Sequence, residues 1–110
     1  MKQFFTDRSV LLVVLVIFIA CKLPHLSYPF YWDESWPYAP AIHEMYKHGI
    51  SLMPGAVNPE LSRGHPLFFH AAAATWMHLF GTGNKSLHAF ALFISLMFLI
   101  TIHEAGYRIF

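Results

Sequence analysis

Two adjacent carboxylates, Asp33 and Glu34, are the residues of this chain best suited to chemistry. They stand in the aromatic stretch 31–36 and follow a hydrophobic N-terminal segment by about ten uncharged residues. Acidic side chains next to a bilayer are disfavoured unless they have a function, so such a pair marks a candidate functional site. The chemistry open to a positioned carboxylate is proton transfer.

A second polar group follows about thirty residues later, in segment 58–66, where the chain returns to an apolar stretch. Arg63 and His65 flank Gly64, which lets the backbone turn or approach a ligand closely. Pro66 suits the first turn of a following helix. The two side chains could face an anion, and an interfacial arginine that meets lipid headgroups is an equally good interpretation.

The chain has eight histidines, which raises the question of a metal site. His43 and His48 are five residues apart, so they would not share one helix face as the histidines of zinc proteases do. Four others are scattered over apolar segments: His70, His78, His88 and His103. For these we expect hydrogen-bonded packing or interface positions rather than metal coordination.

Composition favours a membrane protein. Of the 110 residues, 56% are hydrophobic and 12% are charged, whereas soluble domains are about 25% charged. The formal net charge of +1 excludes a strong electrostatic case for nucleic-acid binding, which would need clustered Lys and Arg. The single cysteine, Cys21, cannot form an internal disulfide.

Three apolar windows predict transmembrane helices at residues 9–28, 65–81 and 86–103. The first holds twelve consecutive apolar residues, 10–21, followed by Lys22, whose long amine can reach the membrane surface. The other two just reach the roughly 20 residues that a bilayer core requires. The expected fold is therefore an all-α membrane protein with three transmembrane helices.

The positions of these helices make residues 29–64 an extracytoplasmic loop. Pro40 at a first helical position and Gly49 just past an end predict a short helix over residues 40–48. Its apolar stripe suits a helix that lies along the membrane surface rather than crossing it; the stripe consists of Ala41, Ile42, Met45 and Tyr46. In the second window, the small residues 71–74 predict a close helix-packing face.

Orientation is read from the basic residues. Lys2, Arg8 and Lys85, the last in the short turn 81–86, place the N-terminus in the cytoplasm and the long loop outside. The run that ends at Cys21 also resembles a lipoprotein signal. Phe18 fits poorly where such signals prefer leucine, so an uncleaved signal anchor is the favoured interpretation.

The order of these motifs resembles that of the membrane glycosyltransferases of the GT-C superfamily. Within it, the protein O-mannosyltransferase and aminoarabinose-transferase branch is the most similar. The resemblance covers nearly all 110 residues. The matching pieces are Asp33-Glu34, His43-Glu44-Met45 with Gly49, Gly64-His65-Pro66-Leu67, Leu79-Phe80-Gly81, and the ending 106–110.

The resemblance implies an inverting sugar transfer outside a cell membrane, expected to be the bacterial inner membrane. The donor would be a polyprenyl-phosphate-linked sugar, and the acceptor a hydroxyl group of a glycan, lipid or protein. Asp33 would be the base and Glu34 a hydrogen-bonding support, while Arg63 and His65 would bind the donor phosphate. No cofactor is certain, a divalent metal ion is left open, and no residue is assigned to a metal.

Two departures from the family pattern change these expectations. His65 stands where the family has lysine, with one following proline instead of two, so the charge at this position depends on pH. Family members also have many more spans, and three helices cannot complete a cavity for a lipid-linked sugar. Residues 1–110 are therefore expected to be the N-terminal part of a longer enzyme, inactive by themselves.

Two other functions remain open from the sequence. The first is a small non-catalytic membrane protein, such as an accessory subunit whose aromatic loop contacts a partner. The second, which the histidine spacing disfavours, is a histidine-rich metal-binding membrane protein.

Overall fold

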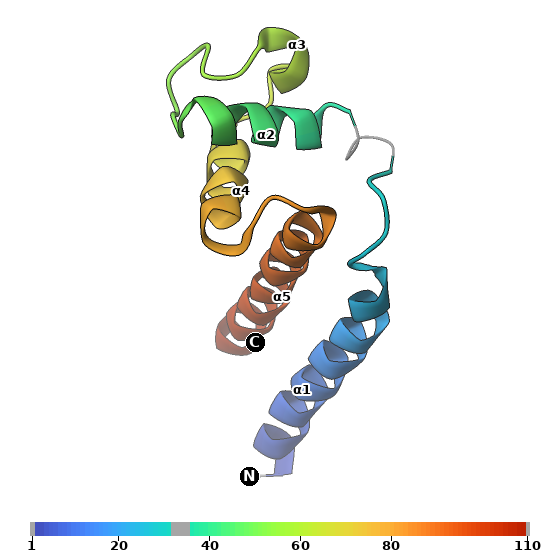
Figure 1. The fold of residues 1–110 in the computed structure, drawn as a ribbon. Coiled ribbons are helices and arrows are strands. Elements are labelled where there is room, and N and C mark those ends of the chain that lie inside the picture. The colour runs from blue at the N-terminus through green and yellow to red at the C-terminus, as the bar shows by residue number, and fades with distance from the viewer. Residues whose placement is uncertain (1, 32–35, 110) are drawn as a thin grey trace. The chain divides into compact units, whose positions relative to one another are not determined.

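The computed structural model describes residues 2–31 and 36–109, with side chains from Arg8 onward, and this described part is helical without any strand (Figure 1). The expected all-α fold is thus confirmed. The helices are α1 (Lys2–Lys22), α2 (Tyr38–His48), α3 (Pro59–Ser62), α4 (Leu67–Phe80) and α5 (Asn84–Ile109), and a 3₁₀ turn, η1 (Leu23–His25), follows α1. The chain divides into two compact units: Ser27–Phe90 is one, and Met1–Leu26 with Ala91–Phe110 is the other.

Two helical stretches in the described part are long and apolar enough to cross a membrane, namely Arg8–His25 and Asn84–Ile109. At about 1.5 Å per residue, α1 and α5 measure about 31 and 39 Å, against about 30 Å for a hydrocarbon core. The apolar side chains of α1 lie exposed; Leu12 and Val16 are 64% and 58% exposed. Such a surface needs lipid or other helices around it.

The end of α1 comes earlier than the predicted residue 28. Pro24 has no backbone N–H to continue the α-helical ladder, and the chain changes to η1, which the Leu26 N–H closes by donating to the Leu23 carbonyl at 3.3 Å. The His25 ring bonds through Nδ1 to the Cys21 carbonyl at 2.8 Å. This bond satisfies one of the carbonyl groups that a helix end leaves open.

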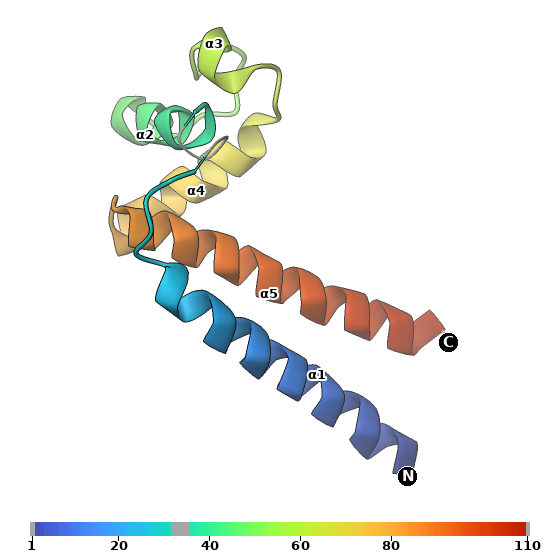
Figure 2. The ribbon, with the colours of Figure 1, turned by 90° about the vertical axis from the view of Figure 1, so that its right-hand side faces the viewer.

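The second unit is built on the packing of α2 against α4 (Figures 1 and 2). The predicted short helix is confirmed, although α2 starts two residues earlier, at Tyr38. It ends where expected, at Gly49, whose φ of 108° is open to glycine and whose N–H donates to Met45 at 3.0 Å. Its apolar stripe is the buried face, with Ala41, Ile42 and Met45 in the core.

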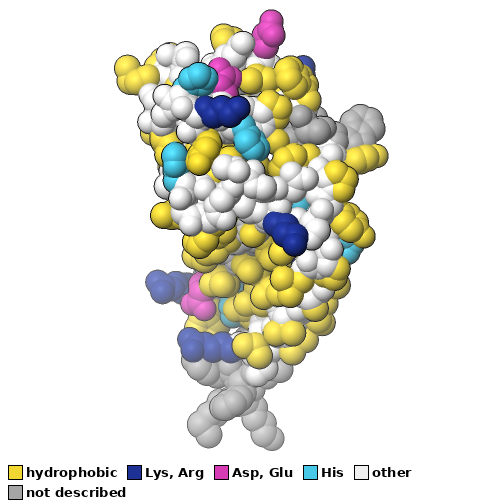
Figure 3. Space-filling view, viewed as in Figure 1, with side chains coloured by type: hydrophobic (Ala, Val, Ile, Leu, Met, Phe, Trp, Pro, Cys, Tyr) yellow, Lys and Arg dark blue, Asp and Glu magenta, His cyan; other side chains and the backbone are white. Residues whose placement is uncertain are grey.

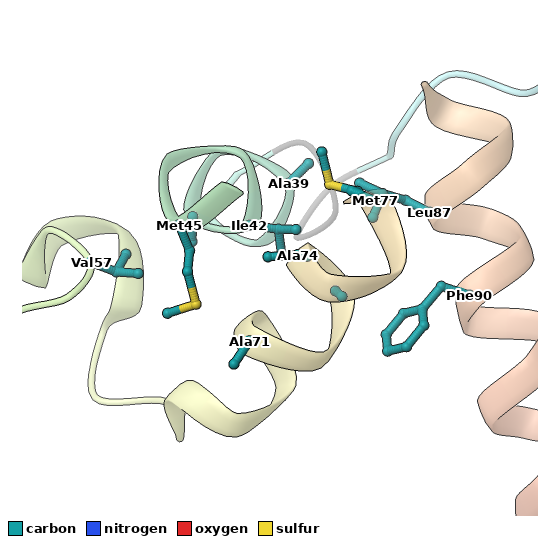
Figure 4. Packing of buried hydrophobic residues seen from close by; sticks show 11 residues of the cluster. Ala39, Ile42, Met45, Val57, Ala71, Ala74, Met77, Leu87 and Phe90 are labelled. Atoms are coloured by element: carbon teal, nitrogen blue, oxygen red, sulfur yellow. The ribbon is translucent and has the colours of Figure 1, made fainter. Parts of the chain in front are cut away.

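Small residues of α4 receive this stripe (Figure 4). Ala73 and Ala74 are fully buried and Ala71 nearly so, which confirms the predicted packing face at residues 71–74. Without bulky side chains the two backbones can approach closely, and Met45 and Met77 fill the remaining space. Phe90 of α5 closes the core on another side, with its ring centroid 5.7 Å from that of Trp76.

The predicted second span, residues 65–81, is represented by a shorter helix. Pro66 precedes the first turn of α4, and Gly81, with φ 102°, ends it after 14 residues. Its length of about 21 Å falls short of a hydrocarbon core of about 30 Å. The described structure therefore contains two helices of spanning length, and α4 is not one of them.

α2 contacts both ends of α4. Tyr38, the first residue of α2, lies against the start of α4, with its ring centroid 6.1 Å from that of Phe69. Farther along α2, the Tyr46 ring lies 4.3 Å from that of His78, and His43 Nε2 lies 3.1 Å from the carbonyl oxygen of Thr82, just past the end of α4. These contacts thus join α2 to both ends of α4.

His43 is a specific link in this arrangement. Its Nδ1 lies 2.7 Å from the carbonyl oxygen of Ala39, so both ring nitrogens face carbonyl oxygens. The tautomer of the ring decides which of the two carbonyls receives its N–H.

Substitution of His43 with alanine is expected to lower the free energy of unfolding by about 1 kcal/mol, since the bond to Thr82 joins α2 to the α4–α5 turn. Denaturant unfolding of the detergent-solubilised chain measures it. His48→Ala, at an exposed position of the same helix, is the control and should leave the midpoint unchanged. Equal losses in the two variants would refute the link.

Candidate functional site

The acid pair, Asp33 and Glu34, lies outside the described residues. The described chain resumes at Trp36, which is exposed, and continues through the buried Pro37 into the first turn of α2. Asp33 and Glu34 therefore remain predictions from the sequence. The structure does describe the other predicted site residues, Arg63 and His65.

Arg63 and His65 lie on a tight turn between α3 and α4. Arg63 ends α3 with a left-handed backbone (φ 45°), and its N–H donates to Pro59 at 2.9 Å. Gly64 follows with φ 76°, and the His65 N–H donates to Ser62 at 2.8 Å. The left-handed conformation costs a residue with a Cβ about 1–2 kcal/mol. The side chains of Arg63 and His65 are exposed.

α3 itself was not expected from the sequence. The side-chain oxygen of Asn58 accepts the Glu60 N–H at 3.0 Å, and Pro59 occupies the first helical position. Asparagine followed by proline and an acidic residue is a typical helix start, so the signal was present. Because α3 ends at Arg63, this residue belongs to a hydrogen-bonded turn.

The turn with Arg63 and His65 leads directly into the N-terminus of α4. Pro66 is the N-cap and has no side chain that could accept a hydrogen bond, so no side-chain cap covers the first-turn N–H groups. A helix N-terminus carries about half a positive charge. The exposed Arg63 and His65 immediately precede this helix end in the chain, and an arginine beside a helix N-terminus suits an anion.

Tyr38 brings the other part of the loop to this turn. Its ring centroid lies 5.3 Å from that of His65 and 6.2 Å from that of His70, and the latter two rings are nearly parallel. Tyr38 comes only a few residues after the acid pair in sequence. The described contacts therefore join the start of α2 to the turn that carries Arg63 and His65.

His70 is the site residue that sequence reasoning missed. Its side chain is 1% exposed, and neither ring nitrogen has a hydrogen-bond partner among the described residues. Burial lowers the pKa of His70, because apolar surroundings disfavour the imidazolium ion. The expected packing position of His70 is confirmed, whereas the expected hydrogen bond does not reach full geometry within the described residues. The sequence could not show this, because part of the surroundings comes from α2.

Other histidines in the described part have ordinary roles. The His88 ring makes an edge contact with Phe30 at 5.3 Å, and His103 Nδ1 lies 3.8 Å from a carboxylate oxygen of Glu104. Among the residues that the structure describes, no group of three or more His, Cys, Asp or Glu side chains is placed to hold a metal ion.

Charged side chains are few on the face of the molecule shown in Figure 3, where they stand among hydrophobic ones. The exposed hydrophobic residues include Phe68, Leu79 and Phe80 of α4, each more than 60% exposed. Exposed apolar side chains at both ends of a short helix suit a membrane boundary or further packed helices.

Comparison of the chain with protein-family models, with curated proteins and with solved structures finds no match.

Proposed function

We propose that this chain is the N-terminal part of a membrane glycosyltransferase that moves a sugar from a polyprenyl phosphate to a hydroxyl acceptor. The motif order that resembles the GT-C superfamily supports this proposal, as do two helices of spanning length. The compact unit of residues 27–90 supports it as well, because it contains the helix N-terminus of α4, which suits a phosphate.

The contact between Tyr38 and His65 is the observation that carries the proposal. It joins the two parts of the loop that the reaction needs, at a ring separation of 5.3 Å. Glu34 precedes Tyr38 by four residues and Asp33 precedes it by five, so the acid pair adjoins this contact in the sequence.

The chemistry assigned to the site is one displacement. Asp33 accepts the proton of the acceptor hydroxyl while its oxygen attacks the anomeric carbon. The bond from that carbon to the phosphate oxygen breaks, and the phosphate leaves with the electron pair. Arg63 and His65 stabilise the anion that forms, so no strong general acid is needed. Attack opposite the leaving group inverts the anomeric centre.

In the proposed topology α1 and α5 cross the membrane, with the N-terminus in the cytoplasm and the loop outside. This orientation depends on Lys2 and Arg8, because Lys85 then lies on the outer side with the loop. The expectation of a third span at residues 65–81 changes to a helix at the outer membrane surface. The reason is that α4 has 14 residues and contacts α2 at both ends. The membrane proposed is the inner membrane of a bacterial cell.

Replacement of Arg63 with alanine is expected to weaken donor binding by the full-length enzyme tenfold or more. A charge-assisted hydrogen bond is worth about 1.5–3 kcal/mol, and loss of such a bond should raise the donor KM. The control is Lys47→Ala, which removes an exposed basic residue of the same loop. An unchanged affinity for the phosphate lipid in the Arg63 variant would remove Arg63 from the phosphate site.

The proposed function is tested by supplying radiolabelled polyprenyl-phosphate sugars to membranes that contain the complete gene product. We expect label to pass to a hydroxyl-bearing acceptor only when the gene is expressed. The competing function, an accessory membrane protein without catalysis, predicts equal labelling with and without the gene. It also predicts stable association with a partner through the exposed apolar face of α4.

A further inference from the structure

The buried histidine of α4, His70, takes no part in the reaction proposed above. A buried polar atom without a partner destabilises a fold, and His70 has two such atoms at 1% exposure within the described structure. A purely structural histidine would pair at least one of them. A buried ring nitrogen without a protein partner is able to bond to a ligand.

The His70 ring is directed toward the N-terminal end of α4. Helical side chains lean toward the preceding turn, which for His70 is the turn that begins after Pro66. The Pro66 carbonyl interacts with the ring enough to raise its pKa in part, but without the geometry of a full hydrogen bond. Tyr38, in contact with both histidine rings, makes one group of the three.

This end of α4 also has the properties of an anion site. No side chain caps its first-turn N–H groups, and a phosphate at a helix N-terminus gains hydrogen bonds from such groups and from the helix dipole. Arg63, exposed on the adjoining turn, adds a full positive charge. The helix end and the unpaired histidine directed toward it are independent observations that point to the same ligand chemistry.

We propose that His70 donates a hydrogen bond to a phosphate ester held at the N-terminus of α4, together with Arg63 and His65. The inference rests on the proposed function only for the source of that phosphate, a polyprenyl lipid. A neutral ring supplies one N–H without repelling Arg63. Exposed His65 has to turn aside from Tyr38 for a phosphate oxygen to reach His70.

The test compares His70→Phe with His70→Gln in the full chain, solubilised in detergent. Thermal unfolding is followed during titration with inorganic phosphate, with polyprenyl phosphate and with phosphatidylglycerol. We expect polyprenyl phosphate to raise the unfolding temperature of the wild-type chain. His70→Phe should weaken that apparent affinity about tenfold or more, while His70→Gln, which keeps an N–H donor, should weaken it less than about threefold.

Stability without ligand separates binding from folding. Phenylalanine removes two unpaired polar atoms, so His70→Phe should unfold at or above the wild-type temperature in the absence of phosphate. His78→Phe, at an exposed position of the same helix, is the matched control. Equal stabilisation of wild type and His70→Phe would overturn the inference, and so would a response to phosphatidylglycerol alone, which indicates ordinary headgroup contact.

The titrations and a transfer assay together distinguish the role of His70 from the proposed enzyme function. Stabilisation by inorganic phosphate that depends on His70, without any response to polyprenyl phosphate, supports the anion site and contradicts the lipid donor. Sugar transfer by the complete gene product that is unaffected by His70→Phe supports the enzyme and overturns the role of His70.

Discussion

Replacement of Asp33 with asparagine is expected to lower the rate of sugar transfer by the full-length enzyme about 10²–10⁴-fold. A positioned general base contributes acceleration of this size, and the amide of asparagine cannot accept the proton of the acceptor hydroxyl. The variant should reach the membrane in normal amounts, because asparagine keeps the size of the side chain. Initial rates at saturating donor, normalised to the amount of inserted protein, measure the effect.

Two neighbouring substitutions make this result specific. Glu34→Gln should cause a smaller loss, since Glu34 is assigned a supporting hydrogen bond, and glutamine retains part of that capacity. Glu44→Gln, on α2 of the same loop, should leave the rate within about twofold, because surface changes away from a site have small effects. Turnover of the Asp33 variant at the wild-type rate would remove Asp33 from the role of base.

Truncation of Met45 to alanine is expected to have the largest effect on stability, a loss of about 2–5 kcal/mol in the free energy of unfolding. Met45 is 0% exposed and belongs to the α2–α4 core (Figure 4). The small residues of α4 that face it, Ala71 and Ala74, cannot expand to fill the cavity. Because this core fixes Tyr38 next to the Arg63 turn, donor binding should weaken along with stability.

Met53→Ala provides the matched control, since Met53 is 71% exposed on the loop after α2. We expect it to change the free energy of unfolding by less than about 0.5 kcal/mol. Denaturant unfolding of both variants in the same detergent gives the comparison. A similar midpoint for the two variants would show that α2 and α4 do not share a close-packed core.

Helix starts and ends account for what could be predicted from the sequence. Gly49 and the stripe Ala41, Ile42 and Met45 identify α2, because a glycine stop and a 3.6-residue period act locally. The same local rules explain the error in the length of the second apolar window. Hydropathy counts uncharged residues from 64 to 84, but Pro66 and Gly81 limit the helix to 14 of them.

The surroundings of α4 show what local rules cannot supply. A turn at Gly64 was predictable from its freedom at positive φ, whereas the left-handed Arg63 was not, because that conformation is disfavoured and depends on the α3 turn. The burial of His70 depends on α2, a segment distant in sequence. The positions of Asp33 and Glu34, which lie outside the described residues, stay predictions.

The sidedness of residue 33 tests the central claim most directly, because the result does not depend on knowing the sugar. Asp33→Cys in a Cys21→Ser background is exposed to a membrane-impermeant maleimide on intact cells, with Lys2→Cys as the cytoplasmic control. The account predicts that position 33 is labelled on intact cells and position 2 only after the membrane is opened. Labelling of position 33 only in opened cells would contradict it, because the base would then face the cytoplasm, away from the donor sugar.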